Sequence, residues 1–175
     1  ADQGLVFVGP PPAALAALGD KAEARAIATR GGVPVLRGTP DATSLDEALA
    51  FLDSLDGNAA MIKAIAGGGG RGMRVVRDRG DLPDAFARCE SEARAAFGDG
   101  RLYIEQHVSG VRHIEVQVLG DHTGRVIHLG ERDCSIQRRH QKIIEIAPAP
   151  QLDPVLRERL ADDAVRVAVE ANLQN

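Results

Sequence analysis

A glycine-rich run at residues 67–72, interrupted by one arginine, constrains the fold of this chain more than any other segment. It lies between two apolar runs, residues 60–66 and 73–76, and the second of these alternates as a β-strand does. Glycine adopts backbone conformations that other residues avoid, but each glycine costs entropy on folding. The pattern therefore predicts a β-hairpin whose glycine tip is longer than a simple turn requires.

Two common glycine motifs do not explain the run. It matches G-x-G-x-x-G formally, but that dinucleotide fingerprint needs a helix to begin at the glycines, and a strand follows here. The Walker pattern fails because Gly72 precedes Met73-Arg74 and not Lys and Ser or Thr. We favour a loop whose backbone N–H groups close over phosphates, with Lys63 and Arg71 nearby. A solvent-exposed turn is the alternative, although four consecutive glycines exceed what a turn needs.

Composition narrows the class of protein. Hydrophobic residues make up 44% of the chain and charged residues 26%, as in folded globular proteins. No apolar run approaches the roughly 18 residues that span a bilayer, and the first residues show no signal peptide. Cys89 and Cys134 form no C-x-x-C pair, which favours a reducing cytoplasm and no zinc site. A net charge of −4 and only four Phe and one Tyr argue against a nucleic-acid partner.

Capping signals and apolar periodicity predict an α+β chain. Helices are expected from capping boxes at residues 20–23 and 44–47, over about 81–97, and from Asp153-Pro154, with Leu156, Leu160, Ala164 and Val167 facing inward. Strands are expected at residues 5–8, 60–66, 73–76, 101–105, 112–119 and 125–131, with a turn at 121–124. A second sheet of so few strands cannot close its own core, so the sequence looks cut from a larger fold.

A polar segment at residues 132–142 holds four strongly basic residues and one acid. It fits a solvated surface loop, a nucleic-acid patch, or a site where arginines and a lysine hold a carboxylate, bicarbonate or phosphate. Composition does not separate these three interpretations. His113 and Glu115 share the polar face of a strand, and we expect an ordinary hydrogen-bonded pair because no third metal ligand has suitable spacing.

Taken together, these segments resemble the biotin carboxylase component of biotin-dependent carboxylases of the acyl-CoA or pyruvate carboxylase type, in the ATP-grasp superfamily. The longest match covers residues 131–142 and continues to Ala147-Pro148-Ala149. Further matches are Gly19-Asp20-Lys21, Lys63-Ala64, the glycine run with Met73-Arg74, and residues 113–117. The likeness covers essentially the whole chain, whereas the chain covers well under half of the family's domain.

The resemblance implies an ATP-grasp fold. Residues 1–35 would end the N-terminal subdomain and form a helical linker, residues 36–107 would be the mobile lid, and residues 108–175 would begin the C-terminal subdomain. The family uses MgATP and bicarbonate to make carboxyphosphate and passes its CO2 to N1 of biotin on a carrier domain. The implied partners are this biotin carboxyl carrier domain and a carboxyltransferase, with a homo-oligomer left open.

The resemblance also implies residue roles. Lys21 and Lys63 would hold the nucleotide phosphates beneath the glycine loop. Glu105 would accept from the adenine amino group, and the next three residues would form the hinge around the base. Lys142, together with Arg139, would act at the bicarbonate and carboxyphosphate site. The implied nucleotide-binding set is Lys21, Lys63, Gly67, Gly68, Gly69, Gly70, Arg71, Gly72, Met73, Glu105, Gln106, Val108, His113, Gln137 and His140, with His107 in the hinge.

Some family features differ or fall outside the chain. Ile146 follows Glu145 where many relatives have a second glutamate, and pyruvate carboxylases tolerate an apolar residue there. The family's two Mg²⁺-binding glutamates and its general base are expected beyond residue 175, so we assign no metal ligand here and expect no turnover by the chain alone. The alternatives are another ATP-grasp ligase, such as a carbamoyl-phosphate synthetase, and a non-catalytic nucleotide-binding module. The acceptor of the carboxyl group is not determined.

Overall fold

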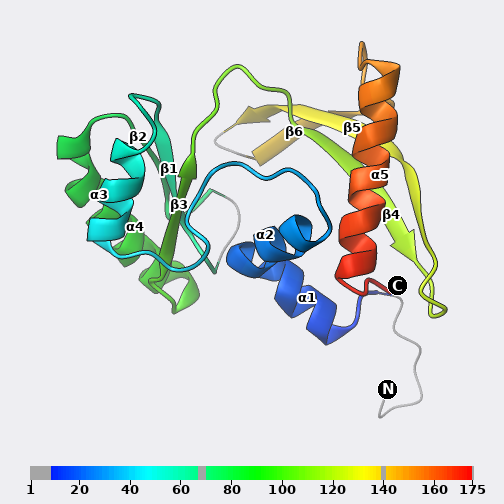
Figure 1. Cartoon of the computed structure of the whole chain (residues 1–175), viewed down its shortest axis with the longest axis horizontal. Helices are drawn as coiled ribbons and strands as arrows, with labels where there is room; N and C mark the ends of the chain where they lie inside the picture. The colour runs from blue at the N-terminus through cyan, green and yellow to red at the C-terminus, as the bar shows by residue number, and fades with distance from the viewer. Residues whose placement is uncertain (1–8, 67–69, 139–140, 175) are drawn as a thin grey trace.

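The computed structural model describes residues 9–66, 70–138 and 141–174. Two antiparallel sheets lie on either side of a pair of helices (Figure 1). These helices are α1 (Pro12–Gly19) and α2 (Lys21–Arg30), and both precede the sheets in the chain. Sequence analysis missed α1, because a proline run usually ends an element. Pro12 is instead the first helical residue, where the missing N–H has no partner to lose. The strand predicted at residues 5–8 lies outside the described residues.

The first sheet has the strand order β2-β1-β3, and α3 and α4 pack against it. Its elements are α3 (Leu45–Asp53), β1 (Ala60–Ala64), β2 (Met73–Val76), a 3-10 turn (Arg79–Asp81), α4 (Leu82–Phe97) and β3 (Leu102–Gln106). Ile62, at the centre, lies opposite Arg74 on β2 and Ile104 on β3. The sheet and its two helices enclose a continuous apolar core. The antiparallel pairing of β1 with β2 confirms the predicted hairpin, although residues 67–69 of its glycine tip lie outside the described residues.

The second sheet has the order β4-β5-β6 and is covered by one helix. Its elements are β4 (Ile114–Gly120), β5 (Val126–Arg138), β6 (Gln141–Ile146) and α5 (Pro154–Glu170). The interpretation of the polar segment as a surface loop is wrong for its described residues, because β5 continues to Arg138 and β6 begins at Gln141. Polar side chains on both faces, together with bulges, remove the apolar alternation by which a strand is recognised.

The inward face of α5 matches the expected one except at its start. Leu160, Ala164 and Val167 are half-buried, and the fully buried positions include Ala161 and Ala168. Leu156, also expected to face inward, is 43% exposed. In the first turn, Arg157 Nε donates to Glu131 on β5 at 2.8 Å. This polar contact is invisible to an apolar periodicity, which explains the error. Among the described residues, no helix is long and apolar enough to cross a membrane.

Candidate functional site

The first group of candidate residues meets where β1 and β3 run side by side. Lys63 on β1 donates from Nζ to Oε1 of Glu105 on β3. The other oxygen, Oε2, accepts from Tyr103 Oη at 3.1 Å and from Arg25 Nη1 at 3.3 Å. Burial and the charge of Glu105 raise the pKa of Tyr103, so its hydroxyl remains a donor. The carboxylate that the sequence assigns to adenine therefore already has three protein donors.

Lys21 brings a second ammonium group to this place. Lys21 is the first residue of α2. The residue before it, Asp20, caps the helix with its carboxylate, which accepts from the N–H groups of Ala22 and Glu23. Lys21 Nζ donates to the carbonyl oxygen of Ile65 at 3.4 Å, just before the glycine loop. Burial, and then the positive charge of Lys63, lower the pKa of Lys21. Two ammonium groups held this way suit an anionic ligand.

The glycine loop is described only at its second end. Gly70 and Gly72 have φ values of +78° and +64°, which favour glycine strongly. A Cβ on Gly72 would also lie 3.1 Å from that of Ala64. Arg71 is exposed and Met73 is half-buried. The first three glycines lie outside the described residues, and contact of the loop with phosphates stays a prediction.

A second group of charges lies on the sheet β4-β5-β6. Lys142 Nζ donates to Oε2 of Glu115, and Arg132 Nε donates to Oε1 at 2.7 Å. Glu145 Oε1 lies 3.7 Å from Lys142 Nζ, and its Oε2 lies 3.6 Å from Arg132 Nε. The hydrogen bond from Lys142 lowers the pKa of Glu115 to about 2 and raises that of Lys142. Both groups are therefore charged at neutral pH.

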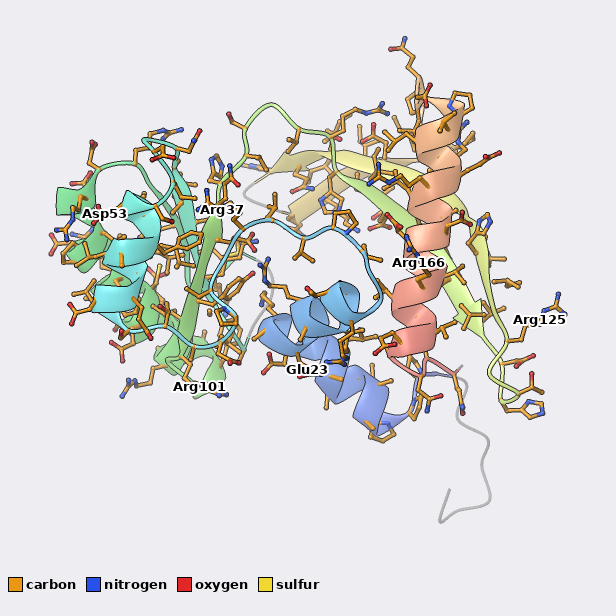
Figure 2. All side chains as sticks on the ribbon, viewed as in Figure 1. Glu23, Arg37, Asp53, Arg101, Arg125 and Arg166 are labelled. Carbon is orange, nitrogen blue, oxygen red and sulfur yellow. The ribbon has the colours of Figure 1, made fainter. Side chains whose placement is uncertain are left out.

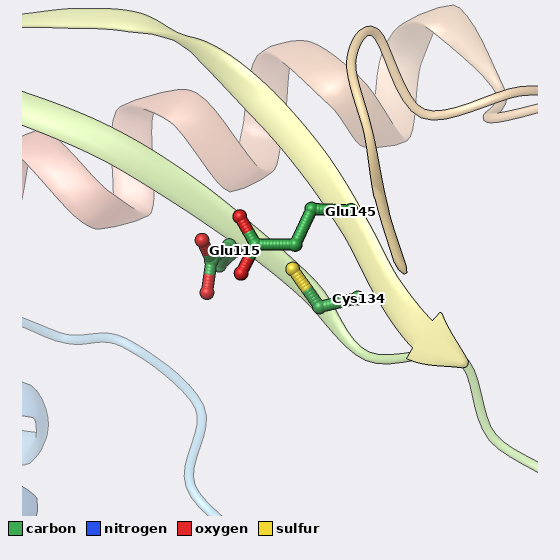
Figure 3. A group of neighbouring side chains, drawn as sticks. All are labelled: Glu115, Cys134 and Glu145. Atoms are coloured by element: carbon green, nitrogen blue, oxygen red, sulfur yellow. The ribbon is translucent and has the colours of Figure 1, made fainter. Parts of the chain in front are cut away.

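The same place contains three side chains that could bind a cation. Figure 3 shows the side chains of Glu115, Cys134 and Glu145 converging, and their ligand atoms lie within 4.8 Å of one another. Two cationic side chains, however, already neutralise the two carboxylates. Burial, followed by the charge of Glu115, raises the pKa of Cys134, so the thiol is protonated. The donor set thus fits a divalent cation poorly.

His113 does not pair with Glu115, so that prediction is wrong. Its Nδ1 lies 3.1 Å from Nε2 of Gln137, whose amide also donates to the Cys134 carbonyl at 2.8 Å. The cationic side chains of Arg132 and Lys142 pair with Glu115 instead, and such charge-assisted hydrogen bonds are among the strongest that a carboxylate makes. The structure therefore brings together two predicted nucleotide-binding residues, His113 and Gln137.

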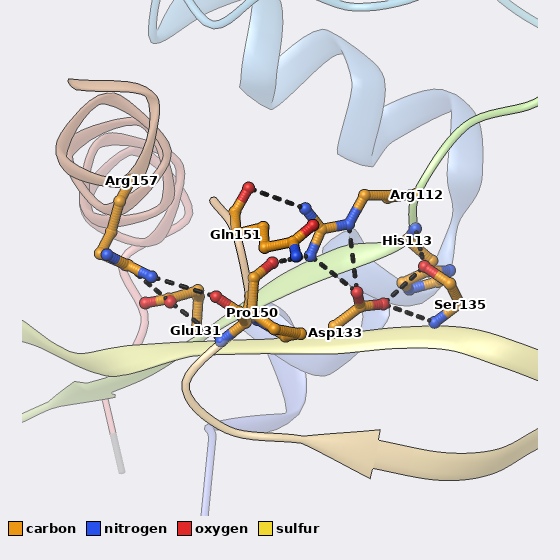
Figure 4. Close-up of polar contacts among 9 residues, drawn as sticks. Arg112, His113, Glu131, Asp133, Ser135, Pro150, Gln151 and Arg157 are labelled. Atoms are coloured by element: carbon orange, nitrogen blue, oxygen red, sulfur yellow. Dashed lines mark hydrogen bonds and ion pairs between the residues drawn. The ribbon is translucent and has the colours of Figure 1, made fainter. Parts of the chain in front are cut away.

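A hydrogen-bond network at the surface supports this arrangement (Figure 4). The N–H of His113 donates to Ser135 Oγ at 2.9 Å, and Ser135 donates to Asp133 Oδ1 at 2.5 Å. Arg112 Nη2 donates to Asp133 Oδ2 at 2.8 Å and to the carbonyl of Pro150 at 2.6 Å. The network ties the start of β4 to β5 and to the turn before α5.

The remaining predicted residues are those of the hinge, which the structure describes, and two that it does not describe. The N–H of Gln106 donates to the Arg37 carbonyl and that of His107 to the Ala59 carbonyl, both at 2.8 Å, while Val108 is 39% exposed. Arg139 and His140 lie outside the described residues.

Sequence reasoning missed the contributions of Arg25, Arg132 and Glu115. Arg25 lies 80 residues from its partner Glu105, and no local pattern marks it. The alternation of β4 did place Glu115 on a polar face, which was the only available signal.

Comparisons with known proteins support this description. A family described as "Carbamoyl-phosphate synthase L chain, ATP binding domain" matches residues 20–175. Pyruvate carboxylase of Schizosaccharomyces pombe is 53% identical over 175 residues, covering 99% of this chain and 15% of that protein. A biotin carboxylase–β,γ-ATP complex from Campylobacter jejuni has 44% identity and a TM-score of 0.95, over 99% of this chain and 39% of that one.

A third comparison is the biotin carboxylase domain of Hydrogenobacter thermophilus 2-oxoglutarate carboxylase, solved with MgADP, ADP and bicarbonate. It has 41% identity and a TM-score of 0.93, covering 99% of this chain and 38% of that one. The fold is thus α+β and of the ATP-grasp type found in biotin carboxylases, as predicted. The chain belongs to the family of the carbamoyl-phosphate synthase L chain ATP-binding domain. It spans only 15% of the length of the S. pombe relative.

Proposed function

We propose that this chain is the nucleotide-binding part of a biotin carboxylase. The reaction is the ATP- and bicarbonate-dependent carboxylation of carrier-bound biotin through carboxyphosphate, within a biotin-dependent acyl-CoA or pyruvate carboxylase. The observation that carries the proposal is the convergence of Lys21 and Lys63 at the start of the glycine loop. The similarity to pyruvate carboxylase and biotin carboxylase over 99% of the chain supports the reaction class.

The proposed ligands are ATP, Mg²⁺, bicarbonate and biotin. Lys21 and Lys63 would hold the phosphates beneath the loop 67–72. Residues 105–108 would frame the base, and His113, Gln137 and His140 would follow the ribose and phosphates. Mg²⁺, which neutralises phosphate charge when bound, would be held by residues outside this chain, because the carboxylates of Glu115 and Glu145 already have cationic partners.

The second group of charges would act on the carboxyl donor. Lys142, with Arg139, would hold the bicarbonate and offset negative charge as it develops. Glu115 would orient the Lys142 ammonium and keep it protonated, since the contact raises its pKa. Phosphoryl transfer needs mainly positioning and charge stabilisation, which these side chains can supply.

The domain organisation belongs to the same proposal. Residues 1–35 would be the end of the N-terminal subdomain with its linker, 36–107 the lid, and 108–175 the start of the C-terminal subdomain. A biotin carboxyl carrier domain and a carboxyltransferase would be partners, and assembly of the full protein into a homo-oligomer belongs to the same proposal. We propose a cytoplasmic location, in keeping with the free and buried Cys89 and Cys134.

The test measures ADP release by the full-length protein that contains this chain, with and without bicarbonate and free biotin. We expect bicarbonate dependence and stimulation by biotin. Lys142→Ala should lower kcat by about 100-fold or more while ADP still binds. The control is Arg125→Ala, at an exposed residue of the β4–β5 turn that Figure 2 labels, and it should leave kcat and ADP binding unchanged. ADP release without bicarbonate dependence would contradict the proposal.

A carbamoyl-phosphate synthetase is the second candidate, favoured by the description of the matching family. Biotin should have no effect on ADP release by such an enzyme, so the same assay separates the two. The isolated chain should show no bicarbonate-dependent ATP cleavage.

A further inference from the structure

We propose that Arg25 is a positioning residue that keeps the Lys63 ammonium available to nucleotide phosphates by sharing the charge of Glu105. The inference rests on the proposed function. It gives a residue of the helical linker control over phosphate affinity without any contact with the nucleotide.

The first step is the arrangement around Glu105. One carboxylate oxygen accepts from Lys63, and the other accepts from Arg25 at 3.3 Å and from Tyr103 at 3.1 Å. Glu105 is only 7% exposed, so solvent competes little for it. The side chains of Arg25 and Lys63 are 18% and 23% exposed. The two cations therefore share a carboxylate at a largely covered place.

The second step is that Arg25 is held firmly. Its Nη2 donates to the carbonyl of Leu36 at 2.6 Å, while Nη1 faces Glu105. A Cβ on Gly38 would lie 3.0 Å from both Arg25 Nη2 and Glu105 Cβ, so the backbone closes tightly over the pair. A planar guanidinium can serve both acceptors at once, whereas an ammonium on a flexible stem is a point charge.

The third step concerns charge. Together, Arg25, Glu105 and Lys63 carry one net positive charge, which an incoming phosphate meets. Without Arg25, Glu105 would neutralise Lys63 completely and would have one donor fewer to share its charge. The phosphate would then meet a neutral Lys63–Glu105 pair and only the Lys21 ammonium beside it. Partly buried charges are screened weakly by salt, so this difference should persist at physiological ionic strength.

The experiment measures the dissociation constants of adenosine, ADP and ATP by calorimetry in the full-length protein. In Arg25→Ala, ADP and ATP should bind about three- to tenfold more weakly, because one unit of nearby positive charge is lost. Adenosine, which has no phosphate, should bind as before. Arg30→Ala is the matched control on the same helix, since Arg30 pairs with Glu23 and Glu170, and it should leave all three affinities unchanged.

A second variant separates charge sharing from a role in folding. Arg25→Ala/Glu105→Gln restores the net charge, so the ratio of ADP to adenosine affinity should return to within about twofold of the parent protein. A merely structural pair would instead lose further stability and affinity in the double variant.

The proposal is overturned if Arg25→Ala binds ADP as tightly as the parent, if adenosine weakens as much as ADP, or if the double variant shows no recovery. Absence of nucleotide binding by the parent protein would instead overturn the proposed function, and the inference with it.

Discussion

At the scale of single residues, the ion pairs of Glu115 hold the second group of site residues together. Its carboxylate joins Lys142 on β6 and Arg132 on β5, and its pKa is about 2 instead of the usual 4.5. A carboxylate whose pKa is lower in the folded state stabilises the fold fully above its unfolded value. That contribution is lost as the pH falls through the folded value. The relevant window therefore runs from about pH 5 down to about pH 2.

We predict that Glu115→Gln lowers the free energy of unfolding by about 1–2 kcal/mol at pH 7, a value reduced for partial solvent screening. The difference should shrink as the pH falls towards 2, where the parent carboxyl becomes about half protonated. Urea unfolding at a series of pH values measures both effects.

Glu90→Gln provides the control. Glu90 pairs with Arg94 one turn along the exposed face of α4, so its loss should cost less than about 1 kcal/mol. Identical pH profiles for the two variants would contradict the special role of Glu115.

At the scale of elements, the capping signals show where local sequence is sufficient. In α3, Ser44 Oγ accepts from the N–H of Glu47 at 3.3 Å, and Glu47 Oε2 accepts from the N–H of Ser44 at 2.7 Å. The predicted capping box is therefore confirmed. In α2, only half of the predicted box forms, because the Glu23 carboxylate pairs with Arg30.

We predict that Ser44→Ala destabilises the protein by about 1 kcal/mol, because it removes the N-cap acceptor of α3. Ser91→Ala, at an exposed position inside α4, should change stability by no more than about 0.5 kcal/mol and should favour the helix slightly. Chemical denaturation of both variants measures the difference. Equal stabilities would show that the capping box contributes nothing.

At the scale of the whole molecule, the proposed lid contains its own core. The buried cluster between the first sheet and its helices consists of Ala48, Leu52, Leu55, Ala60, Ile62, Ala64, Val76, Leu82, Cys89, Ala93, Leu102 and Ile104. All of these residues fall between the proposed boundaries 36 and 107. By contrast, every residue of β6 in the second sheet is exposed.

We predict that a fragment of residues 36–107 folds alone and unfolds in one cooperative transition, because it keeps this whole core. A fragment of residues 108–175 should show no such transition, since three strands and one helix leave β6 uncovered. Thermal unfolding followed by circular dichroism measures both. A lid fragment without a cooperative transition would refute the proposed boundaries.

The sequence by itself determined the elements whose signals are local and the family to which the chain belongs. A cap, a helix stripe and a hairpin depend on residues a few positions apart, so α3, α4 and the glycine hairpin could be predicted. The polar hairpin of β5 and β6 could not, because its residues carry no apolar alternation.

Only the tertiary structure decided which charges meet. Arg25 reaches Glu105 across 80 residues, and Lys142 reaches Glu115 across 27. Any of several cations could pair with each carboxylate as far as composition is concerned. Which cation pairs with which carboxylate depends on burial, on strand register and on the direction of each side chain. These features are set only once the chain has folded.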